Sequence, residues 1–213
     1  MKFVIFHGAF GGPNENWFPD LQKSLELLGQ EVIVPQFPVD TWNDITEAGP
    51  NNPSVRQTLD HWTEVFEKVN KELSPHESLC FVGHSLGPVF ILHMVSQFNL
   101  TLDSAIFVCP FLTKLNRAWQ IDTANASFYK SDFDFISLKK QIPVSYAIYS
   151  SDDPYVPVES ARTFARNMGS SIIESKSGGH FNGEAHCTSL PLIVELCKVR
   201  IAPGAKKNYF SVV

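Results

Sequence analysis

Residues 81–90 read FVGHSLGPVF and join two kinds of local sequence. Residues 79–82 form a short apolar run typical of a buried strand, whereas residues 89–95 form an apolar run that suits a buried helix. Between them lies Ser85, with a glycine two positions away on each side. The stretch therefore predicts a sharp turn from strand to helix with a hydroxyl at its corner.

A turn of this kind suits a nucleophilic serine. It pushes the side chain out of the backbone path and places it at the positive end of a helix. Gly83 and Gly87 supply flanking positions without a Cβ, and Pro88 is tolerated in the first helical turn. We expect the N–H of Leu86 to point at a developing oxyanion. The alternative interpretation is a glycine-rich turn with a solvated serine; P-loop and dinucleotide-binding patterns are absent.

Six short apolar runs alternate with helical patterns along the chain. They cover residues 2–6, 31–34, 79–83, 105–109, 144–149 and 171–174. Runs that are apolar throughout indicate strands covered by helices on both faces. The sequence therefore predicts a single α/β domain over residues 1–213, built on a six-stranded parallel sheet with helices on both faces.

Several amphipathic stripes predict the helices. The longest steps by four and three residues through Val55, Leu59, Trp62, Phe66, Val69 and Leu73. Ser54 and Gln57 are expected to form a capping box at its start. Shorter stripes begin at Phe18, Val158 and Leu190.

Composition excludes several classes of protein. The net charge is −5 and the 17 lysines and arginines are scattered, which argues against a nucleic-acid partner. The apolar run at the N-terminus has four residues, too short for a signal-peptide core, and no run approaches membrane-spanning length. The four cysteines lack zinc or CxxC spacing, so buried free thiols are expected. We therefore expect a cytoplasmic protein with no membrane partner, no metal and no cofactor.

Candidate acid and base residues follow the last two predicted strands. In parallel sheets ligands bind beyond the carboxyl ends of the strands, and a serine nucleophile of this kind is followed along the chain by Asp and then His. SSDDPYVP (150–157) offers Asp152 and Asp153, and SGGHFNGEAH (177–186) offers His180, with His186 as a competitor. Each of these could instead be a turn or surface residue. Their order makes the catalytic interpretation the better one.

The first predicted strand leads directly into HGAFGG (7–12). This loop is expected to place a second backbone N–H, that of Ala9, opposite Leu86. An ordinary glycine-rich turn is the alternative.

With these features the chain resembles the α/β-hydrolase superfamily, and within it the small serine hydrolases of the retinoblastoma-binding-protein-nine / YdeN-like family. The resemblance rests on FVIFHGAFGG, Trp17, GHSLG, SSDDPYVP and GGHFN, and it spans residues 2 to about 199. It implies a triad of Ser85, Asp153 and His180, where Asp153 is preferred to Asp152 for its D-x-x-V-P spacing. The first loop departs from the family, whose members favour a Gly-Asn sequence at this position. The tail 202–213 has no counterpart.

The substrate pocket is less defined by the sequence. Phe10 is expected to wall it, and His7 is a candidate rim residue. The aromatics Phe128 and Phe133, with Tyr129 and Phe135 beside them, could line an acyl pocket or pack in the core. Residues 110–141 are too few for a separate cap domain, so we expect a minimal cap or none and an open cleft.

The leading hypothesis is hydrolysis of a small carboxylic ester, or of a thioester or amide, through an acyl-enzyme on Ser85. The alternative is a protein-interaction module that keeps the hydrolase fold and acts through a protein partner, because a fold alone does not decide function.

Overall fold

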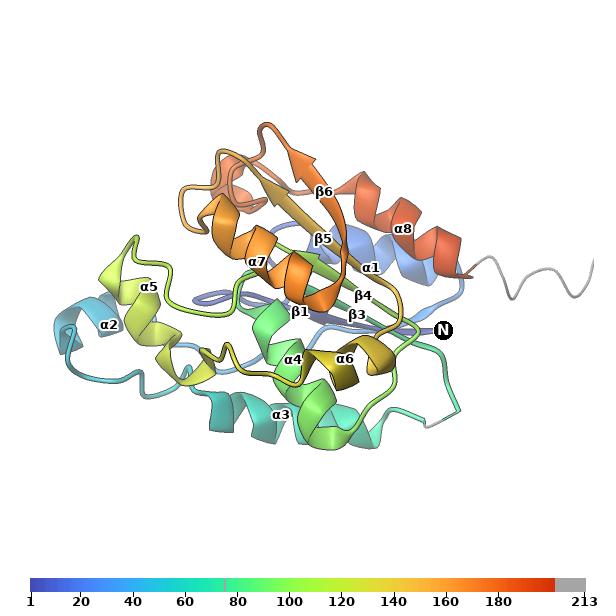
Figure 1. Cartoon of the computed structure of the whole chain (residues 1–213), viewed down its shortest axis with the longest axis horizontal. Coiled ribbons are helices and arrows are strands. Elements are labelled where there is room, and N and C mark those ends of the chain that lie inside the picture. The colour runs from blue at the N-terminus through green and yellow to red at the C-terminus, as the bar shows by residue number, and fades with distance from the viewer. Residues whose placement is uncertain (75, 202–213) are drawn as a thin grey trace, which may run out of the picture.

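A six-stranded, all-parallel sheet in the order β2-β1-β3-β4-β5-β6 forms the centre of the molecule (Figure 1). The computed structural model describes residues 1–74 and 76–201, so the tail 202–213 lies outside the described residues. The strands are β1 (Lys2–Phe6), β2 (Glu31–Ile33), β3 (Leu79–His84), β4 (Ser104–Val108), β5 (Ser145–Ser150) and β6 (Ser171–Ser175). All six strands lie where the sequence predicted them, with ends that differ by at most one residue.

Helices cover both faces of this sheet, as predicted (Figure 1). The pair α1 and α8 packs together on one face, while α3, α4, α6 and α7 contact one another in sequence on the other. The helices are α1 (Phe18–Leu27), α2 (Trp42–Ala48), α3 (Leu59–Lys71), α4 (Gly87–Phe98), α5 (Trp119–Ala124), α6 (Phe135–Gln141), α7 (Val158–Met168) and α8 (Pro191–Ile201).

The longest predicted helix starts later than its apolar stripe suggested. α3 begins after Thr58, whose side chain accepts a hydrogen bond from the N–H of His61, and Val55 is 74% exposed. The predicted capping box is wrong because Ser54 and Gln57 have other partners. The hydroxyl of Ser54 and the N–H of Gln57 both donate to the carboxylate of Asp40.

An aromatic cluster fixes the carboxyl end of β1. Phe37 stacks on Trp62 with ring centroids 4.6 Å apart, and both rings contact Phe90 of α4 edge-on. Phe6 of β1 packs on Phe37 as well. The loops that follow β1 and β3 thus rest on a rigid, fully buried base.

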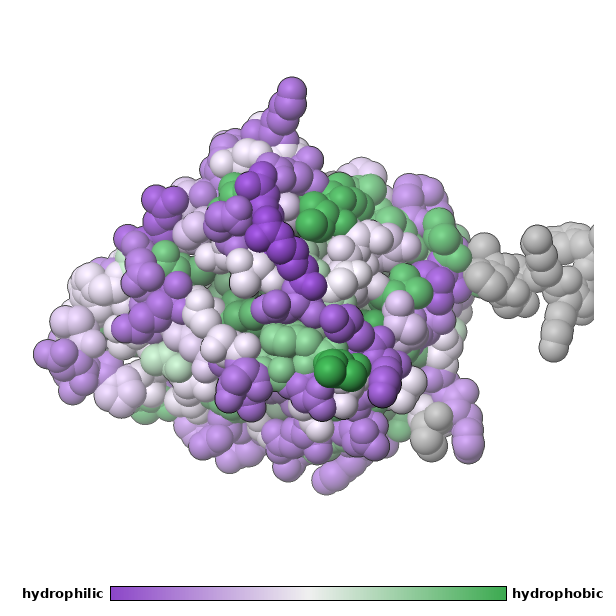
Figure 2. Space-filling view, viewed as in Figure 1, coloured by the Kyte–Doolittle hydropathy of each residue, from purple (hydrophilic) through white to green (hydrophobic). Residues whose placement is uncertain are grey.

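One face of the molecule carries mainly polar residues. In Figure 2 hydrophilic side chains cover most of the visible face, and hydrophobic ones form small separate patches. Among the described residues, no helix is both long enough and apolar enough to cross a membrane.

Candidate active site

Ser85 occupies the turn between β3 and α4 in a strained backbone conformation. Its φ is +59°, in the left-handed region that residues other than glycine seldom adopt. α4 begins two residues later at Gly87, with Pro88 in its first turn. The N–H of Ser85 donates to the carbonyl of Val108 at the end of β4, over 2.8 Å, which ties the turn to the neighbouring strand.

Close packing explains the glycines around this turn. A Cβ on Gly87 would lie 2.7 Å from the carbonyl oxygen of Phe6, and one on Gly83 would lie 2.8 Å from the nitrogen of Pro88. A Cβ on Gly8 would lie 2.8 Å from the Cβ of Ser85. Larger residues at these positions would therefore push the turn away from the sheet and the loop after β1 away from Ser85.

Asp153 and His180 form a buried pair. Nδ1 of His180 donates to Oδ2 of Asp153 over 2.8 Å, and Oδ1 of Asp153 accepts the N–H groups of Tyr155 and Val156. Burial alone would raise the pKa of Asp153, but these hydrogen bonds and the charge interaction with His180 outweigh it and lower that pKa. Because a carboxylate only accepts, Nδ1 carries the proton and Nε2 is left able to accept one.

Asp152 has a different position. Its carboxylate accepts the N–H of Gly179 over 2.9 Å and is exposed. It therefore supports the backbone of the His180 loop without contacting the imidazole. His186, the competing histidine, is exposed after a short 3-10 turn, and it does not line the cavities beside Ser85 described below.

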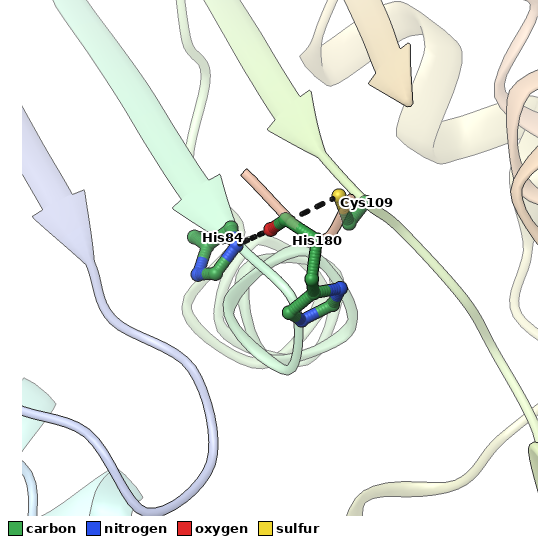
Figure 3. Close-up of side chains that lie close together, drawn as sticks. All are labelled: His84, Cys109 and His180. Carbon is green, nitrogen blue, oxygen red and sulfur yellow. Dashed lines mark hydrogen bonds between the residues drawn. The ribbon is translucent and has the colours of Figure 1, made fainter. Parts of the chain in front are cut away.

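The backbone of His180 is held from two neighbouring strands (Figure 3). Nε2 of His84, at the end of β3, donates to the carbonyl of His180 over 2.8 Å, and the thiol of Cys109, just after β4, points at the same oxygen over 3.6 Å. On the other side of the loop, Nε1 of Trp17 donates to the carbonyl of Phe181 over 3.0 Å. The sequence alone indicates no role for His84, because only its contact with a distant loop reveals one.

His84, Cys109 and His180 also form a group whose ligand atoms lie within 4.8 Å of one another. Figure 3 shows, however, that His84 and Cys109 are directed at the carbonyl oxygen of His180 and not at a common empty point. Burial raises the pKa of the Cys109 thiol well above its usual value, which disfavours the thiolate that a metal requires. The geometry thus indicates support of the loop.

The loop 7–12 is fixed by a buried glutamine. The N–H of Phe10 donates to Oε1 of Gln57 over 2.9 Å, and Nε2 of Gln57 donates to Oδ1 of Asn125 over 2.9 Å. Because the N–H of Phe10 is already engaged, Ala9 stays the candidate second oxyanion donor of this loop, opposite Leu86. Gln57 had been assigned to a helix cap, so its place behind this loop was missed.

The prediction that His7 lies at the rim of the pocket is wrong. Its side chain is fully buried, with Nδ1 donating to the carbonyl of Gly8 and Nε2 accepting the N–H of Phe37. Burial lowers the pKa of His7 to about 4, despite the opposing hydrogen bond to Gly8. It is a structural residue behind the loop and not a residue of the pocket rim.

Two cavities meet at Ser85 and His180. One has a volume of about 370 Å³ and the other about 390 Å³, and both are bordered by Ala9, Phe10 and Glu184. The second cavity is lined in addition by apolar and aromatic side chains, namely Trp42, Leu115, Ile121 and Tyr155. The described residues show no hydrogen bond between the side chains of Ser85 and His180. In enzymes, such a contact often shortens only when substrate binds.

The pocket wall differs from the expected one. Phe128 is fully buried against Trp62, and Phe133 is buried against His93, so neither lines the cavities at Ser85. Their place is taken by the short helices α2 and α5, which lie together at one end of the molecule (Figure 1). α2 was missed because seven residues are too few for a periodic stripe, although its capping box, Thr41 with Asp44, is legible in the sequence.

Comparisons with known proteins agree with this architecture. Residues 3–198 match the model of the serine hydrolase family. YdeN of Bacillus subtilis (strain 168), provisionally described as a hydrolase, is 26% identical over 197 residues, which cover 92% of this chain and 93% of YdeN.

Solved structures show the same fold. The crystal structure of the B. subtilis ydeN gene product superposes with a TM-score of 0.78 at 25% identity, covering 94% of this chain and 98% of that one. A metagenome-derived structure from work on the lipolytic enzymes LipS and LipT has a TM-score of 0.69 at 14% identity, covering 95% and 93% of the two chains, and it supports the fold alone. The chain therefore belongs to the serine hydrolase family and is a YdeN-like member of the α/β-hydrolase superfamily.

Proposed function

We propose that the protein hydrolyses small carboxylic esters through an acyl-enzyme on Ser85, with thioesters and amides as chemically related substrates. The observation that carries this proposal is the buried Asp153–His180 pair, whose imidazole opens onto the same cavities as Ser85. Membership of the serine hydrolase family supports it independently.

The proposed reaction has two steps. The oxygen of Ser85 attacks the substrate carbonyl while Nε2 of His180 takes the hydroxyl proton, and Asp153 stabilises the imidazolium that results. The N–H groups of Leu86 and Ala9 stabilise the oxyanion. Collapse of this intermediate expels the alcohol, which receives the proton from His180. Water, which gives a proton to His180, then attacks the acyl-enzyme, and as the acid leaves His180 passes that proton to the oxygen of Ser85.

The apolar cavity suggests the acyl group. Its volume is about 390 Å³ and its walls include Trp42, Leu115 and Ile121. Such a cavity buries a short acyl chain or a small ring, and any longer chain extends into water.

A fluorophosphonate probe with mass mapping of the labelled peptide tests the proposal. We expect stoichiometric labelling at Ser85 and none in the Ser85→Ala variant, whose kcat for short p-nitrophenyl esters should fall about 10⁴–10⁶-fold with an unchanged circular dichroism spectrum. An inert Ser85 in the folded protein would contradict the proposal and favour the alternative of a protein-interaction module.

A further inference from the structure

The cleft at Ser85 has two arms of different chemistry. The apolar arm is the cavity beside α2 and α5, with Trp42 and Ile121 in its wall. The polar arm is the other cavity, which the loop 7–16 and the loop 180–184 enclose. Its walls contain two carboxylate side chains, Glu15 and Glu184, together with the amides of Asn16 and Asn182. Glu15 lines the polar arm alone, whereas Glu184 borders both arms. A substrate whose carbonyl lies at Ser85 therefore meets apolar side chains in one direction and both carboxylates in the other.

We propose that the polar arm binds a cationic group of the substrate, so that the protein prefers esters that carry an ammonium group over neutral or anionic ones. Glu15 and Glu184 are the residues that set this preference. The inference rests on the proposed ester hydrolysis at Ser85, and it names the substrate class of that site.

Glu184 is held in position beside the expected base. The hydroxyl of Tyr155 donates to its carboxylate, and Nδ2 of Asn182 donates to it over 3.4 Å. The hydrogen bond to Glu184, together with burial, raises the pKa of Tyr155 to about 12, so Tyr155 stays a donor at neutral pH. The ring of Tyr155 in turn packs edge-on against His180 with centroids 5.2 Å apart. The Glu184 carboxylate is thus oriented by a side chain that touches the imidazole.

Glu15 brings the second carboxylate from the loop of the expected oxyanion donor. Its Oε2 lies so near Gly11 that a Cβ added there would be 3.2 Å away. The two carboxylates therefore come from two loops, far apart in sequence, that meet at Ser85.

Within the described residues, neither arm is lined by lysine or arginine. Lys114 and Arg117, the cations nearest in sequence to Leu115 of the apolar arm, line a different cavity beside Trp119. Among the described residues, no cation that lines the cleft therefore neutralises the potential of these two exposed carboxylates.

A third observation also favours a positively charged ligand. His84 borders the polar arm, and its Nδ1 is buried without a hydrogen-bond partner among the described residues. Because Nε2 of His84 is the donor to the carbonyl of His180, Nδ1 carries a lone pair. Burial, with the nearby His180 adding to it, lowers the pKa of His84 to about 3, so this ring adds no positive charge to the arm.

Matched esters test the inference in the native protein. Butyrylcholine is compared with 3,3-dimethylbutyl butyrate, its neutral isostere, and with O-butyryl glycolate, an anionic ester. A second pair places the charge in the acyl part: p-nitrophenyl 4-(trimethylammonio)butanoate against p-nitrophenyl 5,5-dimethylhexanoate. We expect kcat/KM for the cationic ester to exceed that of its isostere about tenfold in at least one pair, because each contact with an exposed carboxylate should contribute roughly threefold. This ratio should shrink in high salt.

Substitutions of Glu15 and Glu184 test whether these two residues cause the preference for cationic esters. Glu15→Gln and Glu184→Gln should each lower the ratio of cationic to neutral kcat/KM about threefold, and the double variant should bring it close to one. Glu67→Gln makes the same charge change on the exposed side of α3 and should leave the ratio as in the native protein. A ratio near one in both pairs, or one that survives the double variant, would overturn the inference.

A binding measurement separates this inference from the proposed hydrolysis. In the Ser85→Ala variant, calorimetric titration with butyrylcholine should give a Kd that rises when Glu15→Gln and Glu184→Gln are added. Binding with this dependence supports the inference even if no ester is hydrolysed. Undetectable binding, in a protein whose native form hydrolyses the neutral esters, rejects the inference and leaves the proposed function standing.

Discussion

Nε2 of His84 donates a 2.8 Å hydrogen bond to the backbone carbonyl of His180, so the residue before the candidate nucleophile holds the candidate base. The two rings also lie 4.8 Å apart. Buried in this way, His84 keeps a single tautomer, with its proton on the nitrogen that faces the carbonyl. The strand that leads into Ser85 thereby fixes the position of the loop that carries His180.

Replacing His84 should therefore lower kcat by more than a loss of folded protein would account for. His84→Phe keeps a ring of similar size but removes the donor, and we expect kcat for p-nitrophenyl butyrate to fall about ten- to hundredfold, because small misplacements of a reacting group cost about this much. His84→Gln can still donate and should recover part of the loss. Equal kcat values in the two variants, at equal melting temperature, would argue against a positioning role.

The two neighbouring aspartates should differ sharply. Asp153→Asn removes the charge that stabilises the imidazolium and favours the wrong tautomer of His180, so kcat should fall about 10⁴-fold. Asp152→Asn keeps an oxygen that can accept the N–H of Gly179 and should cost less than tenfold. Steady-state kinetics of both variants decide the assignment, and a larger loss for Asp152→Asn would show that the acid is misidentified.

Acyl chain length provides a third prediction. The apolar arm of about 390 Å³ should bury acetyl to hexanoyl groups, and longer chains should gain nothing because each methylene left in water forgoes about 0.8 kcal/mol. We expect kcat/KM for p-nitrophenyl esters to level off by hexanoyl, without a jump at the micelle threshold. Trp42→Ala should weaken the dependence on length. A kcat/KM still rising at dodecanoyl would indicate a longer channel.

Two buried histidines should make stability depend on pH. Burial lowers the pKa of His7 to about 4 and that of His84 to about 3, whereas both return to about 6.5 on unfolding. The unfolded chain therefore binds more protons below pH 6.5, so the free energy of unfolding is highest above that pH. As the pH falls below 6.5, the free energy of unfolding should decrease by up to about 1.4 kcal/mol per pH unit for each histidine, until the pH reaches the pKa of that histidine in the folded protein.

Urea unfolding at pH 7.5, 6 and 5 measures this slope. His7→Gln can keep both hydrogen bonds of the imidazole and should remove about half of the dependence. A free energy of unfolding that stays constant between pH 7.5 and 5 would contradict the burial of neutral rings.

The sheet could be predicted from the sequence because each of its strands contains a short continuous apolar run, and the turn at Ser85 because glycine and serine spacing reports local backbone geometry. The order of Ser85, Asp153 and His180 followed from the same topology. The pairing of Asp153 with His180 is visible only in the structure, where it is a direct hydrogen bond.

The pocket could not be predicted in the same way. Phe128 and Trp42 are both large aromatics in loop-rich segments, yet Phe128 lies in the core and Trp42 is 43% exposed at the cavity. What separates them is tertiary packing of short helices, which has no periodic signal. His7 was misjudged for a related reason: its partner Phe37 lies in a segment with no regular structure.

The His180 loop is also fastened to the start of the chain, by Trp17 to Phe181 and by Asn16, whose side chain accepts the N–H of Gly183 over 2.8 Å. A ribosome that has already made Ser85 has not yet made this loop. A nascent chain can thus fold its first strands and expose its serine without any base beside it. Under the proposed mechanism, hydrolysis at Ser85 would begin only when synthesis has passed the histidine loop and its hydrogen bonds to residues 16–17 can form, so the unfinished protein would not react with the esters around it.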